Sequence, residues 1–209
     1  MFCLPTVLPL LKLFEAVFKF TVRESFIYKL ARSIAGTKRI TSTVLKKGNT
    51  SMKEKECLWY FAYGRNVNLH KLRKRIKGDP IKVCRGKLSG YKLVFGKVPG
   101  PKPGTGYATI IPRTEEFVEG ALYLLRKQDL ARLDVYEGVG RGAYRRCVIK
   151  VFNVDLKVQV DASTYVAIKV NERLKPPREY LAEIIEGARK IGLTQNWIAR
   201  LERLMNEAL

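Results

Sequence analysis

Glu137 is the residue of this 209-residue chain whose type and position best suit acid–base chemistry. It stands where a predicted helix stops, within Leu133-Asp134-Val135-Tyr136-Glu137-Gly138, and three glycines follow in the next five residues. A carboxylate there faces the negative end of the helix dipole, and partial burial would raise its pKa toward the range that a general acid or base needs. The residues alone leave equally open an ion pair with an arginine such as Arg141 or Arg145.

A second segment could hold an anionic ligand. In Tyr60-Phe61-Ala62-Tyr63-Gly64-Arg65-Asn66 a predicted strand ends at Tyr63-Gly64 and turns toward a helix. Glycine lets a backbone approach a ligand closely, and the N–H groups at the start of a helix favour anions. The segment is therefore a reasonable cradle for a carboxylate or a developing oxyanion, although strand–glycine–turn sequences are common.

The elements that must position these segments follow from hydrophobic periodicity and from turn residues. The apolar face of the helix before Glu137 should hold Leu130, Leu133 and Tyr136, and Ser89-Gly90 should join two neighbouring strands. Asn68 should cap one helix and Gly192 should end another. These patterns predict an α+β fold, a small mixed barrel or curled sheet flanked by helices. Strands are expected over 58–63, 81–87, 91–98, 107–112, 117–125, 146–152 and 158–167, and helices over 69–76, 128–136, 178–191 and from 194 to the end.

The first 55 residues differ in character from the rest. The run 1–20 is apolar with helix-like spacing, but Lys12, Glu15 and Lys19 interrupt it, which disfavours a membrane span, and the order of its parts does not fit a signal peptide. Two hypotheses remain for 1–55: a basic amphipathic helical extension, or translation that begins at Met52. Either hypothesis predicts a domain over 56–209 and a cytoplasmic protein.

Charge and rare residues limit the function classes. The net charge is +21, from 40 basic and 19 acidic side chains, and it is spread over both parts of the chain. Such a field favours anionic ligands and could attract nucleic acid or anionic lipid without specificity, but no nucleic-acid-binding motif accompanies it. One histidine, His70, and four scattered cysteines give no metal-ligand spacing, so no metal site is expected.

The two segments, in this order and about 70 residues apart, resemble the γ-glutamylcyclotransferase family, which includes the AIG2-like proteins. Members carry a Tyr-Gly-Ser-Asn loop after the first strand, and a catalytic glutamate in a Glu-Gly turn followed by Gly-x-Tyr and a strand. The resemblance covers roughly 58–205, and Tyr-Phe-Ala-Tyr-Gly is closer to the branch that acts on γ-glutamyl amino acids than to the glutathione-specific branch. It continues through Gly106-Tyr107-Ala108-Thr109-Ile110, Gly120-Ala121-Leu122-Tyr123, Pro176-Pro177-Arg178-Glu179-Tyr180, Gly187-Ala188 and Gly192-Leu193.

The resemblance implies a γ-glutamylcyclotransferase-like barrel and a cofactor-free enzyme with a small-molecule γ-glutamyl substrate. The α-amine of such a substrate attacks its own γ-carbonyl, which yields 5-oxoproline and a free amino acid or amine. Glu137 would be the catalytic acid and base, and Tyr144 is a further candidate for the pocket wall. The expected substrate-binding residues are Tyr60, Phe61, Ala62, Tyr63, Gly64, Arg65, Asn66 and Tyr180.

Arg65 departs from the family pattern, which has serine at this position. If only the backbone N–H takes part, the change is tolerable and the guanidinium can reach outward. If Arg65 instead points inward and pairs with Glu137, the pKa of Glu137 falls and the carboxylate is a poor base. A noncatalytic member of the same fold, acting as a basic binding module for nucleic acid, lipid or a protein partner, is therefore the alternative hypothesis.

Overall fold

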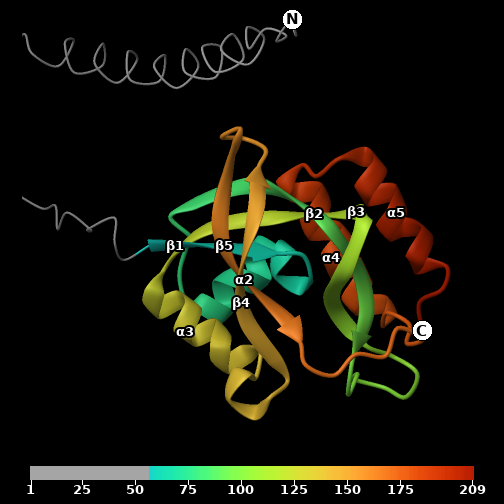
Figure 1. The fold of residues 1–209 in the computed structure, drawn as a ribbon. Coiled ribbons are helices and arrows are strands. Elements are labelled where there is room, and N and C mark those ends of the chain that lie inside the picture. The colour runs from blue at the N-terminus through green and yellow to red at the C-terminus, as the bar shows by residue number, and fades with distance from the viewer. Residues whose placement is uncertain (1–56) are drawn as a thin grey trace, which may run out of the picture. The chain divides into compact units, whose positions relative to one another are not determined.

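The computed structural model describes residues 57–209, which form a closed five-stranded barrel with helices packed around it (Figure 1). The expected α+β barrel is confirmed, whereas the expectations for residues 1–55, the start at Met52 among them, lie outside the described residues. The strands are β1 (Cys57–Ala62), β2 (Lys82–Lys97), β3 (Tyr107–Arg126), β4 (Tyr144–Asn153) and β5 (Val158–Ala167). The helices are α2 (Leu69–Ile76), α3 (Lys127–Tyr136), α4 (Arg178–Ile191) and α5 (Gln195–Met205), with single 3-10 turns η2 (Arg65–Val67) and η3 (Val139–Arg141).

The barrel is of the mixed type. Its strand order is β1-β3-β2-β4-β5, and neighbouring strands run antiparallel until β5 meets β1. There the strands run parallel, with Trp59 opposite Ala162 and Tyr60 opposite Ser163, and the sheet closes. Closure brings the end of β1, from which the Tyr63-Gly64 loop emerges, beside strands that come much later in the chain.

The prediction of four short strands between 81 and 125 is wrong. β2 and β3 are single long strands that pair with each other over nearly their whole lengths, and no hairpin forms at Ser89-Gly90. Gly90 instead has a φ of +81°, and the register between the two strands shifts between Ser89 and Tyr91. A left-handed glycine inside a strand bends it as a bulge does without reversing the chain, so both strands curve together around the barrel.

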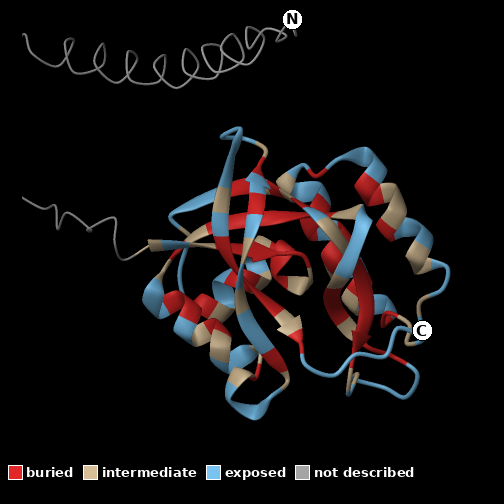
Figure 2. Cartoon of the chain, in the orientation of Figure 1, coloured by how far each residue is buried: buried red, intermediate tan, exposed pale blue. Residues whose placement is uncertain are grey.

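The core fills the barrel and the space under the helices (Figure 2). Phe61, Leu122 and Tyr123 are fully buried. On α3 the predicted apolar face is confirmed for Leu130 and Leu133, but not for Tyr136, which is 57% exposed because it lies at the helix end.

Helix α4 lies close against the turn that follows β1. Gly187 makes this approach possible, because a Cβ at this position would stand 2.5 Å from the backbone nitrogen of Asn68. Asn68 caps α2 as predicted, and its side chain accepts a hydrogen bond from the backbone N–H of His70 (3.1 Å). The glycine thus fixes α4 beside the loop that carries Gly64 and Arg65. No helix within residues 57–209 has the length and the apolar character that crossing a membrane requires.

Candidate active site

Glu137 ends helix α3 and turns into a pocket. Its backbone N–H still donates to the carbonyl of Leu133 (2.8 Å), and the left-handed Gly138 (φ +65°) then ends the helix. The Glu137 side chain is only 15% exposed. Glu137 therefore lies at the end of the helix, as the sequence predicts, and its side chain is also largely buried.

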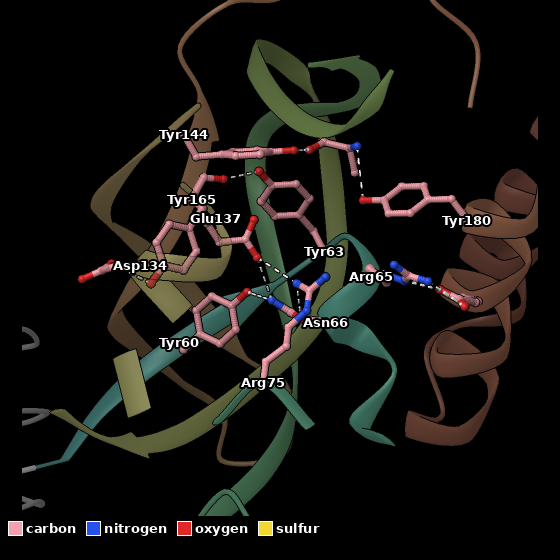
Figure 3. A network of polar contacts seen from close by, with 12 residues as sticks. Tyr60, Tyr63, Arg65, Asn66, Arg75, Asp134, Glu137, Tyr144, Tyr165 and Tyr180 are labelled. Carbon is pink, nitrogen blue, oxygen red and sulfur yellow. Dashed lines mark hydrogen bonds and ion pairs between the residues drawn. The ribbon is translucent and has the colours of Figure 1, made fainter. Parts of the chain in front are cut away.

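One oxygen of the Glu137 carboxylate is held by two donors (Figure 3). Oε1 accepts from Nδ2 of Asn66 (3.1 Å) and from Nη1 of Arg75 (3.0 Å). Nδ2 of Asn66 also donates to the Tyr60 hydroxyl (2.8 Å), and Oδ1 of Asn66 accepts from Arg75 (2.8 Å). Within the described residues nothing donates to the second oxygen, Oε2, so the carboxylate has one fixed oxygen and one free for a ligand.

Burial raises the pKa of the Glu137 carboxyl above its ordinary value of 4.5. Three neighbours act against this increase: the charge of Arg75, the hydrogen bond from Asn66 and the charge of Lys97. The cost of burying the charged form exceeds their combined influence, so the pKa stays raised although the carboxylate is ion-paired. The site thus holds a buried carboxyl with a raised pKa and one oxygen that is open to a ligand.

The pocket around Glu137 has a volume of about 270 Å³ and is rich in tyrosine hydroxyls. Two of these hydroxyls hold the backbone of one residue of β3, because the Tyr144 hydroxyl donates to the Ala108 carbonyl (2.9 Å) and the Ala108 N–H donates to the Tyr180 hydroxyl (3.3 Å). Burial raises the pKa of Tyr180 to about 12, so it stays protonated at neutral pH. Ala108 of β3, Tyr144 of β4 and Tyr180 at the start of α4 thereby meet at one wall of the pocket.

Arg65 points away from Glu137 (Figure 3). Its Nη2 lies 2.9 Å from Oε1 of Glu183 on α4, and its Nε also contacts that carboxylate. Lys71 pairs with Glu183 as well (2.7 Å). Of the two orientations that the sequence left open, the outward one is observed, and the ion-pair partner of Glu137 is Arg75 rather than Arg65, Arg141 or Arg145.

The structure brings most of the predicted site residues together. Ala62 is the exception, since it is 98% buried in the core and does not line the pocket. His70, which was not expected to take part, is exposed on α2. The predicted residues that line the pocket are Tyr60, Phe61, Tyr63, Gly64, Arg65, Asn66, Glu137 and Tyr180, together with the wall candidate Tyr144.

Sequence reasoning missed other charged and aromatic residues of the pocket. Arg75 comes from the last turn of α2, Lys97 from the end of β2, and Tyr107 and Tyr165 from β3 and β5. Arg75 is one of several basic residues on α2, and Lys97 is one of 40 in the chain, so residue type gave no signal. For Arg75 a weak signal exists: it lies three residues after the buried Leu72, at the edge of the helix face that packs inward.

The fold and site define a small mixed barrel whose pocket presents a buried carboxylate and several tyrosines. Known proteins that resemble this chain have been found by sequence and by structure. A model of the AIG2-like family matches residues 117–201. A mouse γ-glutamylcyclotransferase is 29% identical over 154 residues, which cover 72% of this chain and 80% of that protein, and the human γ-glutamylcyclotransferase matches to the same extent. A solved structure of a γ-glutamyl cyclotransferase superposes with a TM-score of 0.62 at 27% identity, covering 70% of this chain and 87% of that one.

The family model, the curated relatives and the solved structure therefore support the AIG2-like/γ-glutamylcyclotransferase superfamily for this chain. Curated relatives from two mammals and a solved structure carry the same enzyme name, which supports an enzyme of this kind.

Proposed function

We propose that this protein is a γ-glutamylcyclotransferase that releases 5-oxoproline from a γ-glutamyl amide, with Glu137 as general acid and base. The observation that carries the proposal is the state of the Glu137 carboxylate: buried, with a raised pKa, one oxygen fixed by Asn66 and Arg75 and the other free in the pocket. The names of the relatives supply the reaction class.

The reaction needs a proton acceptor beside the attacking nitrogen. In the proposed mechanism Oε2 of Glu137 takes a proton from the α-ammonium of the substrate, and the resulting amine attacks the γ-carbonyl carbon. The new C–N bond closes a five-membered ring. Because both reacting groups belong to one molecule, the protein contributes mainly the folded substrate conformation and the proton transfer.

The leaving nitrogen must be protonated before the amide bond breaks. Glu137 returns its proton to this nitrogen, the C–N bond to the leaving group breaks, and the amine departs. The attacking nitrogen loses a second proton as it becomes the lactam nitrogen, and this balances the proton that the released amine takes up as an ammonium ion. A carboxyl whose pKa is raised serves both steps, since it neither binds nor releases the proton too tightly.

The remaining residues would hold the substrate. The backbone of Tyr63-Gly64-Arg65 is proposed to bind the γ-glutamyl part through its N–H groups. This segment lies at the N-terminal end of η2, where the first hydrogen bond of the turn comes from the N–H of Val67, so the N–H groups before Val67 are not used within the turn. Tyr180 closes the pocket from the side of α4. Asn66 and Arg75 act as positioning residues, because they hold Oε1 and thereby aim Oε2.

The proposal is tested by incubating the purified full chain with a panel of γ-glutamyl amino acids and γ-glutamyl amines and measuring 5-oxoproline. Release from at least one member of the panel is expected. If no member releases 5-oxoproline, the enzyme proposal fails, and the alternative hypothesis of a basic binding module is favoured. A binding constant for nucleic acid in the low-micromolar range that falls steeply with salt would then support that alternative.

A further inference from the structure

Among residues 57–209, two cationic side chains of the pocket have no carboxylate partner. Arg65 and Arg75 also line the pocket, but they are bound to Glu183 and Glu137. Lys97 and Arg141 line it too, yet neither takes part in any ion pair among residues 57–209. A cation in such a place is a candidate for recognising an anionic group of the ligand.

Lys97 is held in the wall with most of its hydrogen-bonding capacity unused. The residue is only 8% exposed, and its Nζ donates to the Pro99 carbonyl (3.2 Å). The ammonium also lies 5.5 Å from the ring centre of Tyr107 and 5.9 Å from that of Tyr144. An ammonium group has three donors, so two have no acceptor in the described part of the chain and remain for a ligand.

Arg141 completes the positive side of the pocket from η3. Its guanidinium lies over Gly138, where a Cβ would be 3.5 Å from Nε and from Nη2. Gly138 directly follows Glu137, so Arg141 stands beside the proposed acid–base group, and its exposure places it at the mouth. Burial lowers the pKa of Lys97, the charge of Glu137 opposes this effect and Arg141 adds to it, which is consistent with three charged groups that share one pocket.

We propose that Lys97 and Arg141 determine the specificity of the pocket for its leaving group, because they bind the carboxylate of a leaving amino acid, which a leaving amine lacks. The inference rests on the proposed function. The leaving nitrogen must reach Glu137 to receive a proton, so the group attached to it lies next to Glu137. The same group has to depart, and the mouth beside Arg141 is the exposed side of the pocket.

Charge balance favours this assignment. The γ-glutamyl head carries one ammonium and one carboxylate, and the proposed mechanism places it between Oε2 of Glu137 and the Gly64 loop. A leaving amino acid adds a second carboxylate, which offsets one of these two positive charges and can accept hydrogen bonds from both side chains. A leaving amine adds none, so Lys97 stays buried and uncompensated beside a second positive charge.

The test compares two ligands that differ only in the leaving-group carboxylate, γ-glutamyl-alanine and γ-glutamyl-alaninamide. Their dissociation constants are measured by calorimetry on the full chain carrying Glu137→Gln, so that no turnover is needed. This protein should bind γ-glutamyl-alanine at least about tenfold more tightly, the range expected for a charge-assisted hydrogen bond in a protected site. When Lys97→Met is added to this protein, the dissociation constant of γ-glutamyl-alanine should rise roughly tenfold. The dissociation constant of the alaninamide should change by no more than about twofold.

Three further variants make the outcome specific. Lys97→Arg keeps the charge and should keep most of the preference. Arg141→Met should raise the dissociation constant of γ-glutamyl-alanine by only about threefold, because solvent screens an exposed charge. Lys150→Met is the matched control, since Lys150 is 74% exposed and pairs with Asp161 on the β4–β5 hairpin. Thermal unfolding of each variant shows whether the fold is kept.

The proposal is overturned if the Glu137→Gln protein binds both ligands equally or binds neither. It is also overturned if Lys97→Met weakens both ligands to the same extent, which would place Lys97 on the carboxylate of the γ-glutamyl head. The proposed reaction can fail while the subsite stands. If γ-glutamyl-alanine binds more tightly than the alaninamide but the wild-type protein releases no 5-oxoproline, the subsite is supported and the reaction is rejected.

Discussion

The side-chain amide of Asn66 is hydrogen-bonded to the carboxylate of Glu137, with 3.1 Å between Nδ2 and Oε1, although the two residues are 71 positions apart in the sequence. This contact joins the two segments that carry the family resemblance, the loop after β1 and the end of α3. It also fixes one carboxylate oxygen and leaves the other to the pocket, which is the arrangement that a carboxylate acting as acid and base requires.

Replacing Arg75 with methionine should move the acidic limb of the pH–rate profile to higher pH. Glu137 has to be ionised to accept a proton, so kcat/KM falls as the pH falls through its pKa, which already lies above 4.5. Arg75 is the largest of the influences that lower this pKa, and its removal raises the value further. The measurement is kcat/KM from pH 4.5 to 9.

Arg73→Met is the matched control for this profile. Arg73 lies on the same helix, is 52% exposed and pairs with Asp79 at the surface, so its removal should leave the acidic limb in place. A limb that stays unchanged in Arg75→Met would show that Glu137 does not control the ionisation seen in the rate.

Changing Arg65 to serine, the residue of the family pattern, should preserve activity and reduce stability. The guanidinium faces Glu183 rather than Glu137, and the backbone of the loop is unchanged, so kcat/KM should stay within about threefold of wild type. Loss of the partly exposed ion pair should lower the free energy of unfolding by about 1 kcal/mol. Urea denaturation and steady-state kinetics measure the two effects, and a loss of activity beyond about a hundredfold would assign the side chain a direct role.

The contribution of Glu183 to stability should disappear in acid. The hydrogen bond from Arg65, followed by the one from Lys71, lowers the pKa of Glu183 from 4.5 to about 2. Because the folded-state pKa lies below the unfolded-state value, the stabilisation is complete well above pH 4.5 and is lost as the pH falls toward 2. The difference in unfolding free energy between wild type and Glu183→Gln should therefore shrink between pH 6 and pH 3; a constant difference would argue against the ion pair.

Gly64→Ala should narrow the pocket at its proposed grip. A Cβ at this position would stand 3.1 Å from the Tyr180 hydroxyl and 3.2 Å from the Cβ of Ala108, closer than ordinary contact. Displacement of Tyr180 should lower kcat/KM by roughly ten- to a hundredfold. Gly78→Ala, where a Cβ meets nothing within 4 Å, serves as the control and should behave as wild type. Equal activity of the two variants would mean that the substrate does not depend on this side of the pocket.

Sequence reasoning predicted the elements whose ends carry strong local signals. The bounds of α2, α4 and β5 match the expectation, because Asn68 caps α2 and Gly192, in the left-handed region, ends α4. The long strands β2 and β3 were divided in the prediction, since Gly90 signals a turn in the sequence but produces a bend in a barrel. Pairing between distant strands decides between these two outcomes, and local sequence does not contain it.

For the site, the sequence predicted which segments meet but not how their side chains point. Glu137 and Asn66 could be proposed because they lie in recognisable segments. The orientation of Arg65 depends on Glu183, which reaches it only because Gly187 lets α4 approach the loop. Arg75 was missed because its residue type does not distinguish it from the many other basic residues of the chain. Its contact with Glu137 depends on how α2 packs beside α3.

The most direct test of the central claim is the rate of 5-oxoproline release by Glu137→Gln, measured with the best γ-glutamyl substrate of the wild-type protein. Glutamine keeps the size of the side chain and cannot exchange the proton, so the rate should fall by about a thousandfold or more. Glu202→Gln, a surface change at a residue paired with Arg189, should keep the wild-type rate. A Glu137→Gln protein that is folded, binds substrate and turns over within about twofold of wild type would contradict the assignment of Glu137 as the acid and base.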